Sequence, residues 1–309
     1  MRVVVTGGAG FIGMHSVTAL LAAGHTVLVI DDMRHRSSGE LPAAADCVEA
    51  DVATHAARDA VARFRPGAVL HLAAQGGVNR SWRDPVSDAR CNVLGTVSVL
   101  RAAADSGATR FVLASSGGAL YGDARRLPSH EDDIAAPRSP YGTAKLAAEA
   151  YLRLFTAGAR MSGCALRYGN VYGPGQDGTG EAGVVAITCT RLLRGDAPEI
   201  RGDGAQTRDF VFAPDVAAAN ALALSSGATG AYNIATGAET PVCDVVSMLT
   251  SASGVEQHPV YVDAVHDEVR RSCLDTSRAR AALGWHAATS LQTGLSATYD
   301  SFRGAAAAA

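Results

Sequence analysis

The sequence predicts an α/β protein built on a doubly wound parallel sheet. The 309-residue chain is 48% hydrophobic, which is ample for the core of one large or two ordinary domains. Short β-branched and apolar runs, typical of strands buried on both faces, alternate with helical periodicity before residue 170. The chain also opens on such a run, followed by three glycines at intervals of three residues. This alternation indicates strand–helix–strand units and therefore parallel strand pairing.

The first predicted unit is a strand, a glycine turn and a helix. Val3 to Val5 form the strand, Gly7, Gly10 and Gly13 form the turn, and the apolar residues after Gly13 recur as one face of a helix ending near Gly24. Glycines in this turn leave no Cβ between the backbone N–H groups and a pyrophosphate at the helix N-terminus. The unit therefore predicts a dinucleotide site on a Rossmann-type sheet.

The dinucleotide predicted is NAD rather than NADP. A second strand, residues 26–30, ends in Asp31, whose carboxylate would accept hydrogen bonds from the adenosine ribose and repel a 2′-phosphate. The polar segment 33–40 is expected to wrap the adenosine. Asp51 is placed to accept from the adenine amino group with Val52 packed on the ring, and a solvated aspartate at a strand end is an equally good interpretation.

Polar side chains follow the later strands. The strand at residues 68–74 leads into Gln75 and small residues that allow a cofactor to approach, and its His71 is interpreted as a hydrogen-bonded core residue. A helix over residues 90–104 is expected next, with Asn92 placed to reach a strand end or the nicotinamide. Seven strands are expected before residue 170, beginning near residues 3, 26, 47, 68, 111 and 164, with a less certain edge near 120.

The most chemically specific segment is residues 139–145, which opens a helix. Tyr141 and Lys145 are four residues apart and therefore share one face of it. The ammonium is expected to lower the phenol pKa from about 10 by favouring the phenolate. Such a phenol can exchange a proton with a sugar hydroxyl near neutral pH when it lies within hydrogen-bond reach. The segment follows a strand that ends in Ser115 and Ser116.

Composition excludes several other classes of protein. The net charge of -3 argues against a nucleic-acid partner, and no apolar run is long enough to span a membrane. Val3 to Val5 follow the initiator too closely to be the core of a signal peptide. The six cysteines lack Cys-x-x-Cys spacing and the nine histidines lack metal-ligand spacing. We therefore expect a soluble cytoplasmic protein with neither disulfide scaffold nor metal.

The motifs together resemble the extended short-chain dehydrogenase/reductases, and within them the nucleotide-sugar epimerases related to UDP-galactose 4-epimerase. The resemblance covers nearly the whole chain, and its marks are residues 6–13, 71–75, 115–122, 141–145, 166–174, 202–211 and 283–285. It implies a nucleotide-sugar 4-epimerase in which Tyr141 takes the proton of the sugar 4-hydroxyl, a transient 4-keto sugar forms, and NAD is regenerated. It also implies a homodimer formed through the helices near residues 92–104 and 145–157.

The arguments from the residues and the resemblance together give two sets of site residues. For NAD they are Gly7, Gly10, Phe11, Ile12, Gly13, Asp31, Asp32, Met33, Asp51, Val52, Leu72, Ala73, Ala74, Gln75, Asn92, Tyr141, Lys145, Tyr168 and Val171. For the substrate they are Gln75, Ser116, Gly117, Tyr141, Asn170, Val184, Ile200, Arg208, Glu268 and Arg270. In this resemblance Arg208 contacts the diphosphate, and the alternative is an ion pair with Asp209 that braces a strand.

The sequence departs from the family pattern at two places. Gly117 stands where the family usually has a serine or threonine, so Ser115, Ser116 or a water must replace that hydroxyl. Val265 stands where an arginine commonly binds phosphate, which leaves Glu268 and Arg270 as the remaining polar groups there. The second departure leaves the nucleotide open.

Two domains are expected, with the NAD-binding domain at residues 1–163 and the substrate domain at 164–309. Residues 209–224 are expected to return to the first domain as a strand and a helix. Alternatives are an NDP-hexuronate 4-epimerase and an NDP-sugar 4,6-dehydratase, although Gly118 and Ala119 offer no carboxylate for dehydration. From a different class, the alternative is an NAD-sensing regulatory protein without catalysis.

Overall fold

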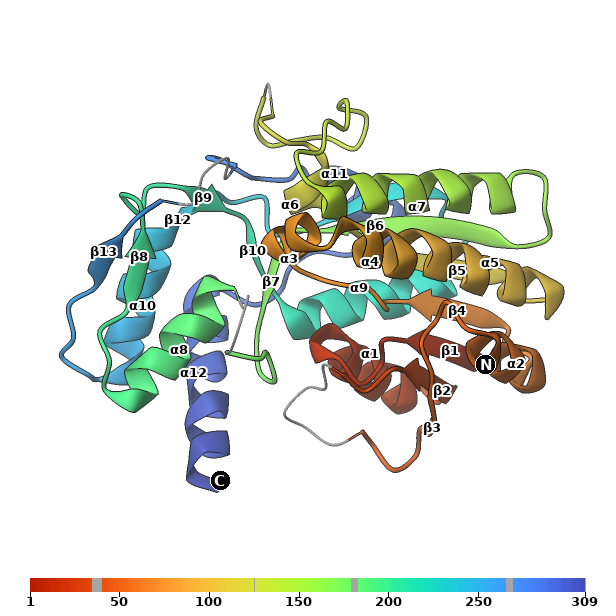
Figure 1. Cartoon of the computed structure of the whole chain (residues 1–309), viewed down its shortest axis with the longest axis horizontal. Coiled ribbons are helices and arrows are strands. Elements are labelled where there is room, and N and C mark those ends of the chain that lie inside the picture. The colour runs from red at the N-terminus through yellow and green to blue at the C-terminus, as the bar shows by residue number, and fades with distance from the viewer. Residues whose placement is uncertain (35–40, 125, 179–182, 265–268, 309) are drawn as a thin grey trace.

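The structure is a computed structural model that describes residues 1–34, 41–124, 126–178, 183–264 and 269–308. A large sheet with helices on both faces forms one side of the molecule, and a smaller unit around three helices forms the other (Figure 1). None of the described helices is both long enough and apolar enough to cross a bilayer.

The main sheet contains seven strands, and every neighbouring pair is parallel. They are β1 (Arg2–Thr6), β2 (Thr26–Asp31), β3 (Asp46–Glu49), β4 (Ala68–His71), β5 (Arg110–Ser116), β6 (Ser162–Tyr168) and β11 (Gly230–Ile234). Their order across the sheet is β11-β6-β5-β4-β1-β2-β3. The doubly wound parallel sheet predicted from the sequence is confirmed, and the strand order runs outward in opposite directions from the neighbouring strands β1 and β4.

One predicted strand is wrong. The segment near residue 120 is the short helix α6 (Gly117–Leu120), and the seventh strand is β11, which begins at Gly230, long after β6 ends at Tyr168. The main sheet therefore has seven strands, as expected, but the seventh is β11 and not the segment near residue 120. A distant strand completes the sheet because β6 would otherwise present an unpaired edge.

Helices cover both faces of the main sheet. Helices α1 (Phe11–Ala22), α9 (Ala213–Ser225) and α11 (Ser277–Leu283) pack on the face to which Val3 and Val5 point. Helices α2 (His55–Phe64), α5 (Thr96–Asp105) and α7 (Pro140–Thr156) pack on the face to which Val4 points. The β-branched run that opens the chain is therefore buried on both sides, as the alternation of side chains along a strand requires.

The helix predicted over residues 90–104 is divided. It begins as the π-helix η1 (Arg90–Gly95) and continues as α5 (Thr96–Asp105). Two short helices, α3 (Val78–Arg83) and α4 (Pro85–Ala89), precede it. Its buried face carries Asn92, Thr96 and Leu100, whereas Val93 and Val97 of the predicted apolar stripe are only half-buried.

The smaller unit is built around α8 (Val184–Arg194), α10 (Val242–Ser253) and α12 (Leu291–Ala308), which share one apolar cluster. Three two-stranded sheets accompany them. β7 (Asn170–Tyr172) pairs with β10 (Phe210–Phe212), β9 (Thr207–Arg208) with β12 (Thr240–Pro241), and β8 (Glu199–Arg201) with β13 (Val260–Val262).

The expected domain limits can be compared with this architecture. A boundary at residue 163 falls inside β6, whose whole length pairs with β5 in the main sheet. Of residues 209–224, the helix α9 does return to the main sheet, where it shares a core with α1. The preceding strand β10 does not, because it pairs with β7.

Candidate active site

The glycine turn between β1 and α1 is shaped for a phosphate group. Gly7 has a φ of +69°, and a Cβ there would lie 2.6 Å from the backbone nitrogen of Ala73. A Cβ on Gly13 would lie 2.1 Å from the carbonyl oxygen of Gly7. Within the described chain, no side chain caps the start of α1 at Gly10. The first N–H groups of the helix, with their partial positive charge, therefore suit an anionic ligand.

Asp31 lies at the end of β2, beside this turn. Its Oδ2 accepts the N–H of Ala9 at 3.0 Å and its Oδ1 accepts the N–H of Met33 at 2.9 Å. Each carboxylate oxygen has a second lone pair, so both can accept from a ribose as well. Asp31 thus holds the turn and retains acceptor capacity toward a ligand.

The other residues expected near the adenosine have different environments. Asp32 pairs with Arg34, and Asp51 accepts the N–H of Ala53 at 2.9 Å. Val52 is only 4% exposed and sits where a Cβ on Gly95 would meet it at 2.7 Å. The Val52 side chain therefore packs largely in the core.

Asn92 and Gln75 are joined by a pair of hydrogen bonds. The Asn92 Oδ1 accepts the N–H of Gln75 at 2.9 Å, and its Nδ2 donates to the Gln75 carbonyl at 3.1 Å. The side chain thus reaches from η1 to the chain just beyond β4. The buried Gln75 Nε2 has no hydrogen-bond partner among the described residues, which suits a ligand that offers an acceptor.

Tyr141 and Lys145 lie on the first turns of α7. Ser139 caps this helix by accepting the Gly142 N–H at 3.1 Å, and Pro140 occupies its first position. The Lys145 Nζ donates to the carbonyl of Ala114 at 3.0 Å and lies 5.8 Å from the centre of the Tyr141 ring. The pair therefore faces the end of β5, where Ser116 interacts with the Tyr141 hydroxyl.

The electrostatics of the pair correct one prediction. Burial raises the pKa of Tyr141 to about 12, a hydrogen bond with Ser116 lowers it, and the charge of Asp88 raises it. Burial lowers the pKa of Lys145 to about 8, against raising effects of Cys91, Asp88 and Glu149. The prediction that Lys145 lowers the pKa of Tyr141 below its ordinary value is therefore wrong, because the cost of desolvating the phenolate is larger than any lowering effect.

Ser115 and Ser116 have different partners. The Ser115 Oγ donates to Glu149 Oε1 at 2.6 Å, and Arg167 binds both oxygens of that carboxylate, at 2.9 and 2.7 Å. All three side chains are buried. The Ser115 hydroxyl is thus committed to a buried ion pair, and Ser116 is the hydroxyl beside Tyr141.

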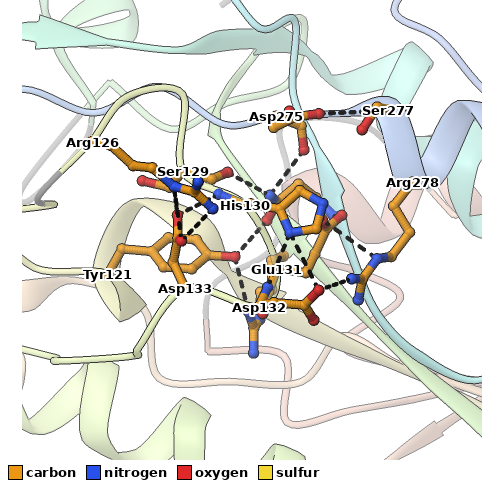
Figure 2. Close-up of polar contacts among 12 residues, drawn as sticks. Tyr121, Arg126, Ser129, His130, Glu131, Asp132, Asp133, Asp275, Ser277 and Arg278 are labelled. Carbon is orange, nitrogen blue, oxygen red and sulfur yellow. Dashed lines mark hydrogen bonds and ion pairs between the residues drawn. The ribbon is translucent and has the colours of Figure 1, made fainter.

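The ion pair continues toward the protein surface. Arg167 also donates to the Tyr121 hydroxyl at 2.8 Å and to the Glu131 carbonyl at 3.1 Å. Figure 2 shows Tyr121, Glu131, Asp132 and Arg278 in this cluster. Tyr121 and Glu131 are buried, whereas the exposed Asp132 pairs with Arg278 at 2.6 Å. The network anchors β6 and the loop after α6 behind the site.

Leu274 explains the glycine at position 117. A Cβ on Gly117 would lie 2.4 Å from Leu274 Cδ1, so the leucine occupies the space of a residue-117 side chain. Leu274 is 1% exposed and packs with Tyr121 and Ala235. The departure from the family pattern is therefore matched by a contact with a residue 157 positions away, as the numbers 117 and 274 give.

The expected substrate residues are distributed around the same edge. Asn170 Oδ1 would lie 3.4 Å from a Cβ on Gly118, which places it beside α6. The N–H of Thr207 donates to the Arg270 carbonyl, so Arg208 and Arg270 lie on adjacent chains, and Arg270 also pairs with Asp203. The proposed pair of Arg208 with Asp209 is absent from the described chain, because the Asp209 carboxylate accepts from Thr236, Gly237 and Leu274.

Most of the other residues predicted to contact NAD or the substrate have side chains that pack in the core or bond within the chain. Ile200 is 1% exposed and packs with Val242 and Val246, with Val184 beside them. The Tyr168 hydroxyl donates to Asn220 at 2.7 Å. Ile12, Leu72 and Val171 pack against the core on one face of the sheet, Ala73 packs on the other, and Phe11 contacts His15. Ala74 is exposed, and Glu268 and Val265 lie outside the described residues.

Comparison with known proteins decides the family. A sequence profile of the NAD dependent epimerase/dehydratase family matches residues 3–235. This chain belongs to that family. A UDP-glucose 4-epimerase of Mycolicibacterium smegmatis is 39% identical over 98% of this chain and 99% of its own length.

Solved structures of the family agree. The UDP-glucose 4-epimerase of Thermotoga maritima, crystallised with UDP-glucose, has a TM-score of 0.94 and 40% identity, covering 98% of this chain and 99% of that one. The enzyme of Thermus thermophilus, in complex with NAD, has a TM-score of 0.93 and 38% identity, with 98% and 99% covered.

The structure of this epimerase/dehydratase family member also reveals residues that the sequence argument missed. Asp88, Glu149 and Arg167 are buried charged side chains around the Tyr141–Lys145 pair. One signal was present in the sequence: Lys145 is the only lysine, so the other members of the 27 Lys and Arg residues are all arginines. Lysine, unlike arginine, shifts its pKa readily when buried, so the single lysine marks position 145 for attention.

Proposed function

We propose that this protein is a nucleotide-sugar 4-epimerase that interconverts UDP-glucose and UDP-galactose. The observation that carries the proposal is the Tyr141–Lys145 pair, which faces the Ser116 end of β5 at the edge of the sheet where ligands of parallel sheets bind. The names of the similar proteins support the same sugar and nucleotide.

The residues present fit NAD. The Gly7 to Gly13 turn would hold the pyrophosphate, and Asp31 would bind the adenosine ribose. The Gln75 Nε2, which has no partner among the described residues, would donate to a polar group near the nicotinamide. When bound, NAD supplies a hydride acceptor and a positive charge that favours the phenolate of Tyr141.

The chain's own residues would handle the proton. Tyr141 takes the proton of the sugar 4-hydroxyl as the 4-keto sugar forms, and returns it after the ring has turned over. Ser116 orients that hydroxyl, and the Lys145 ammonium stabilises the phenolate. Asn170, Arg208 and Arg270 are proposed for the diphosphate, so the nucleotide stays bound while the sugar rotates.

A 4,6-dehydratase is disfavoured by the residues around the pair. Helix α6, which follows Ser116, consists of Gly117, Gly118, Ala119 and Leu120 and offers no acidic side chain. Elimination of water needs a positioned acid and base besides the tyrosine. We therefore favour epimerisation.

The main sheet is proposed as the NAD-binding unit and the unit of α8, α10 and α12 as the nucleotide-sugar unit. We propose a homodimer in which α5, η1 and α7 form the interface, because Leu94, Tyr151 and Leu154 on these helices are 61%, 39% and 72% exposed. A cytoplasmic location is proposed because the spacing of the six cysteines is not that of a disulfide scaffold, which suits a reducing compartment.

The test is a product analysis with purified protein and UDP-glucose, UDP-galactose, UDP-glucuronate and dTDP-glucose. We expect inversion at C4 of the first two, detected by NMR of the sugar. Tyr141→Phe should lower kcat by about 10²- to 10⁴-fold. Tyr261→Phe, at a tyrosine that is 61% exposed on β13, is the matched control. Inactivity on the whole panel, loss of water from the sugar, or parental activity of Tyr141→Phe would each refute the proposal.

A further inference from the structure

Asp88 is a buried carboxylate close to the reacting pair that the proposed mechanism does not use. It lies on α4, which packs against α7, and is 1% exposed. Its Oδ1 accepts a hydrogen bond from Asn92 Nδ2 at 2.9 Å. Its Oδ2 has no hydrogen-bond partner in the described part of the chain. A buried carboxylate left half-satisfied is costly, so its retention calls for an explanation.

The contact fixes the orientation of the Asn92 amide. An ionised carboxylate only accepts, so the NH₂ group of Asn92 must face Asp88. The Asn92 Oδ1 is then left to accept the N–H of Gln75, while the second amide hydrogen reaches the Gln75 carbonyl. Asp88 therefore sets, through Asn92, the position of the chain that follows β4.

Asp88 also differs in charge balance from the other groups around Lys145. Glu149 is compensated by Arg167, burial raises the pKa of the Cys91 thiol, and His71 has a pKa of about 3, so it is neutral. No ion pair joins Asp88 to an arginine among the described residues. The charged and titratable groups on the elements packed against α4 are Arg80 and Arg83 on α3, Arg90 and Cys91 on η1, and Tyr141, Lys145, Glu149, Tyr151 and Arg153 on α7.

We propose that Asp88 is a positioning residue for the reaction, whose carboxylate orients Asn92 against Gln75 and places one negative charge on the helix packed against α7. Two effects follow from one negative charge. It favours the ammonium of Lys145, and it disfavours the phenolate of Tyr141. Its removal should lower the pKa of both groups.

The single lysine makes a direct test possible. Protein labelled with ε-¹³C-lysine has one ε-methylene resonance, and its chemical shift followed from about pH 6 to about pH 10.5 gives the midpoint for Lys145. We expect a midpoint of about 8 in the parent. Asp88→Asn keeps an acceptor for Asn92 but removes the charge, and should lower the midpoint by about one unit.

Three further variants complete the titration. Asp88→Glu retains the charge and should titrate close to the parent, and Asp88→Ser serves as a second neutral variant if Asp88→Asn does not fold. Asp59→Asn removes an exposed carboxylate of α2 and should leave the midpoint unchanged. A neutral Asp88 variant that titrates at the parental midpoint would overturn the proposal.

The second readout rests on the proposed function. In Asp88→Asn the pH profile of epimerisation should move as a whole to lower pH, since the acid limb follows Tyr141 and the alkaline limb follows Lys145. A loss of kcat at every pH without displacement indicates a merely structural role and overturns the proposal. If the parent itself epimerises nothing, the proposed function fails, and the lysine titration still decides the role of Asp88.

Discussion

Gly117 illustrates how a single position depends on a distant side chain. The sequence marks it as a missing hydroxyl, and the structure fills its side-chain space with Leu274. A serine added there must displace a leucine that is fully enclosed, whereas the hydroxyl of Ser116 already faces Tyr141. The side chains at positions 117 and 274 are therefore energetically coupled.

Gly117→Ser should lower the free energy of unfolding by about 1 to 3 kcal/mol through overpacking against Leu274. Leu274→Ala alone should cost about 2 to 5 kcal/mol through the cavity it leaves. The loss of unfolding free energy in the double variant should be smaller than the sum of the two single losses, because the serine then has room. Urea unfolding of the four proteins measures this, and simple additivity would contradict it.

His71 makes the acid stability of the protein depend on one buried ring. Its nitrogens lie 2.7 Å from Thr6 Oγ1 and 3.0 Å from Thr96 Oγ1, as the interpretation of a hydrogen-bonded core histidine predicted. Burial and then the charge of Lys145 lower its pKa from 6.5 to about 3. Between these two values the unfolded chain binds more protons, so stability falls as the pH falls below 6.5.

Protonation of His71 in the unfolded chain should lower the free energy of unfolding by about 2 kcal/mol between about pH 7.5 and about pH 5. His71→Gln keeps hydrogen-bonding groups but cannot titrate, and its stability should fall less over that interval. Urea unfolding at the two pH values gives the comparison. Equal losses in both proteins would show that His71 does not carry the acid sensitivity.

At the level of elements, the Glu149–Arg167 pair connects α7 to β6 and, through Ser115, to β5. A buried charge that loses its partner is destabilised far more than a pair removed together. Arg167→Met should therefore cost about 3 to 5 kcal/mol of unfolding free energy. Glu149→Gln combined with Arg167→Met should recover a large part of it.

The measurement is again urea unfolding, with Arg303→Met as a control that removes an exposed arginine of α12. That control should change stability little, because exposed ion pairs contribute at most about 1 kcal/mol. A double variant at positions 149 and 167 no more stable than Arg167→Met would contradict the argument.

At the level of the whole molecule, the exposed apolar side chains of η1 and α7 predict self-association. Leu154→Glu places a charge where Leu154 is 72% exposed, so the isolated chain tolerates it while an apolar interface does not. Light scattering should give twice the chain mass of 31.6 kDa for the parent and the single mass for the variant. A parent that elutes as a monomer would refute the proposed dimer. Leu222→Glu, at an exposed position on α9, is the matched control.

The sequence by itself determined the features that depend on neighbouring residues. The Gly7 to Gly13 turn, Asp31 at the end of its strand and the Tyr141–Lys145 spacing are local patterns, because backbone geometry and helical periodicity act over a few residues. The parallel sheet followed from the alternation of strands and helices for the same reason.

Tertiary structure decided what depends on contacts between distant segments. It selected Ser116 over Ser115 as the hydroxyl beside Tyr141, added β11 as the seventh strand and brought Leu274 to Gly117. It also buried Asp88 beside the reacting pair and set the pKa of Tyr141 above rather than below its ordinary value. Burial is the physical reason, since desolvation and steric exclusion arise only when segments far apart in the chain pack together.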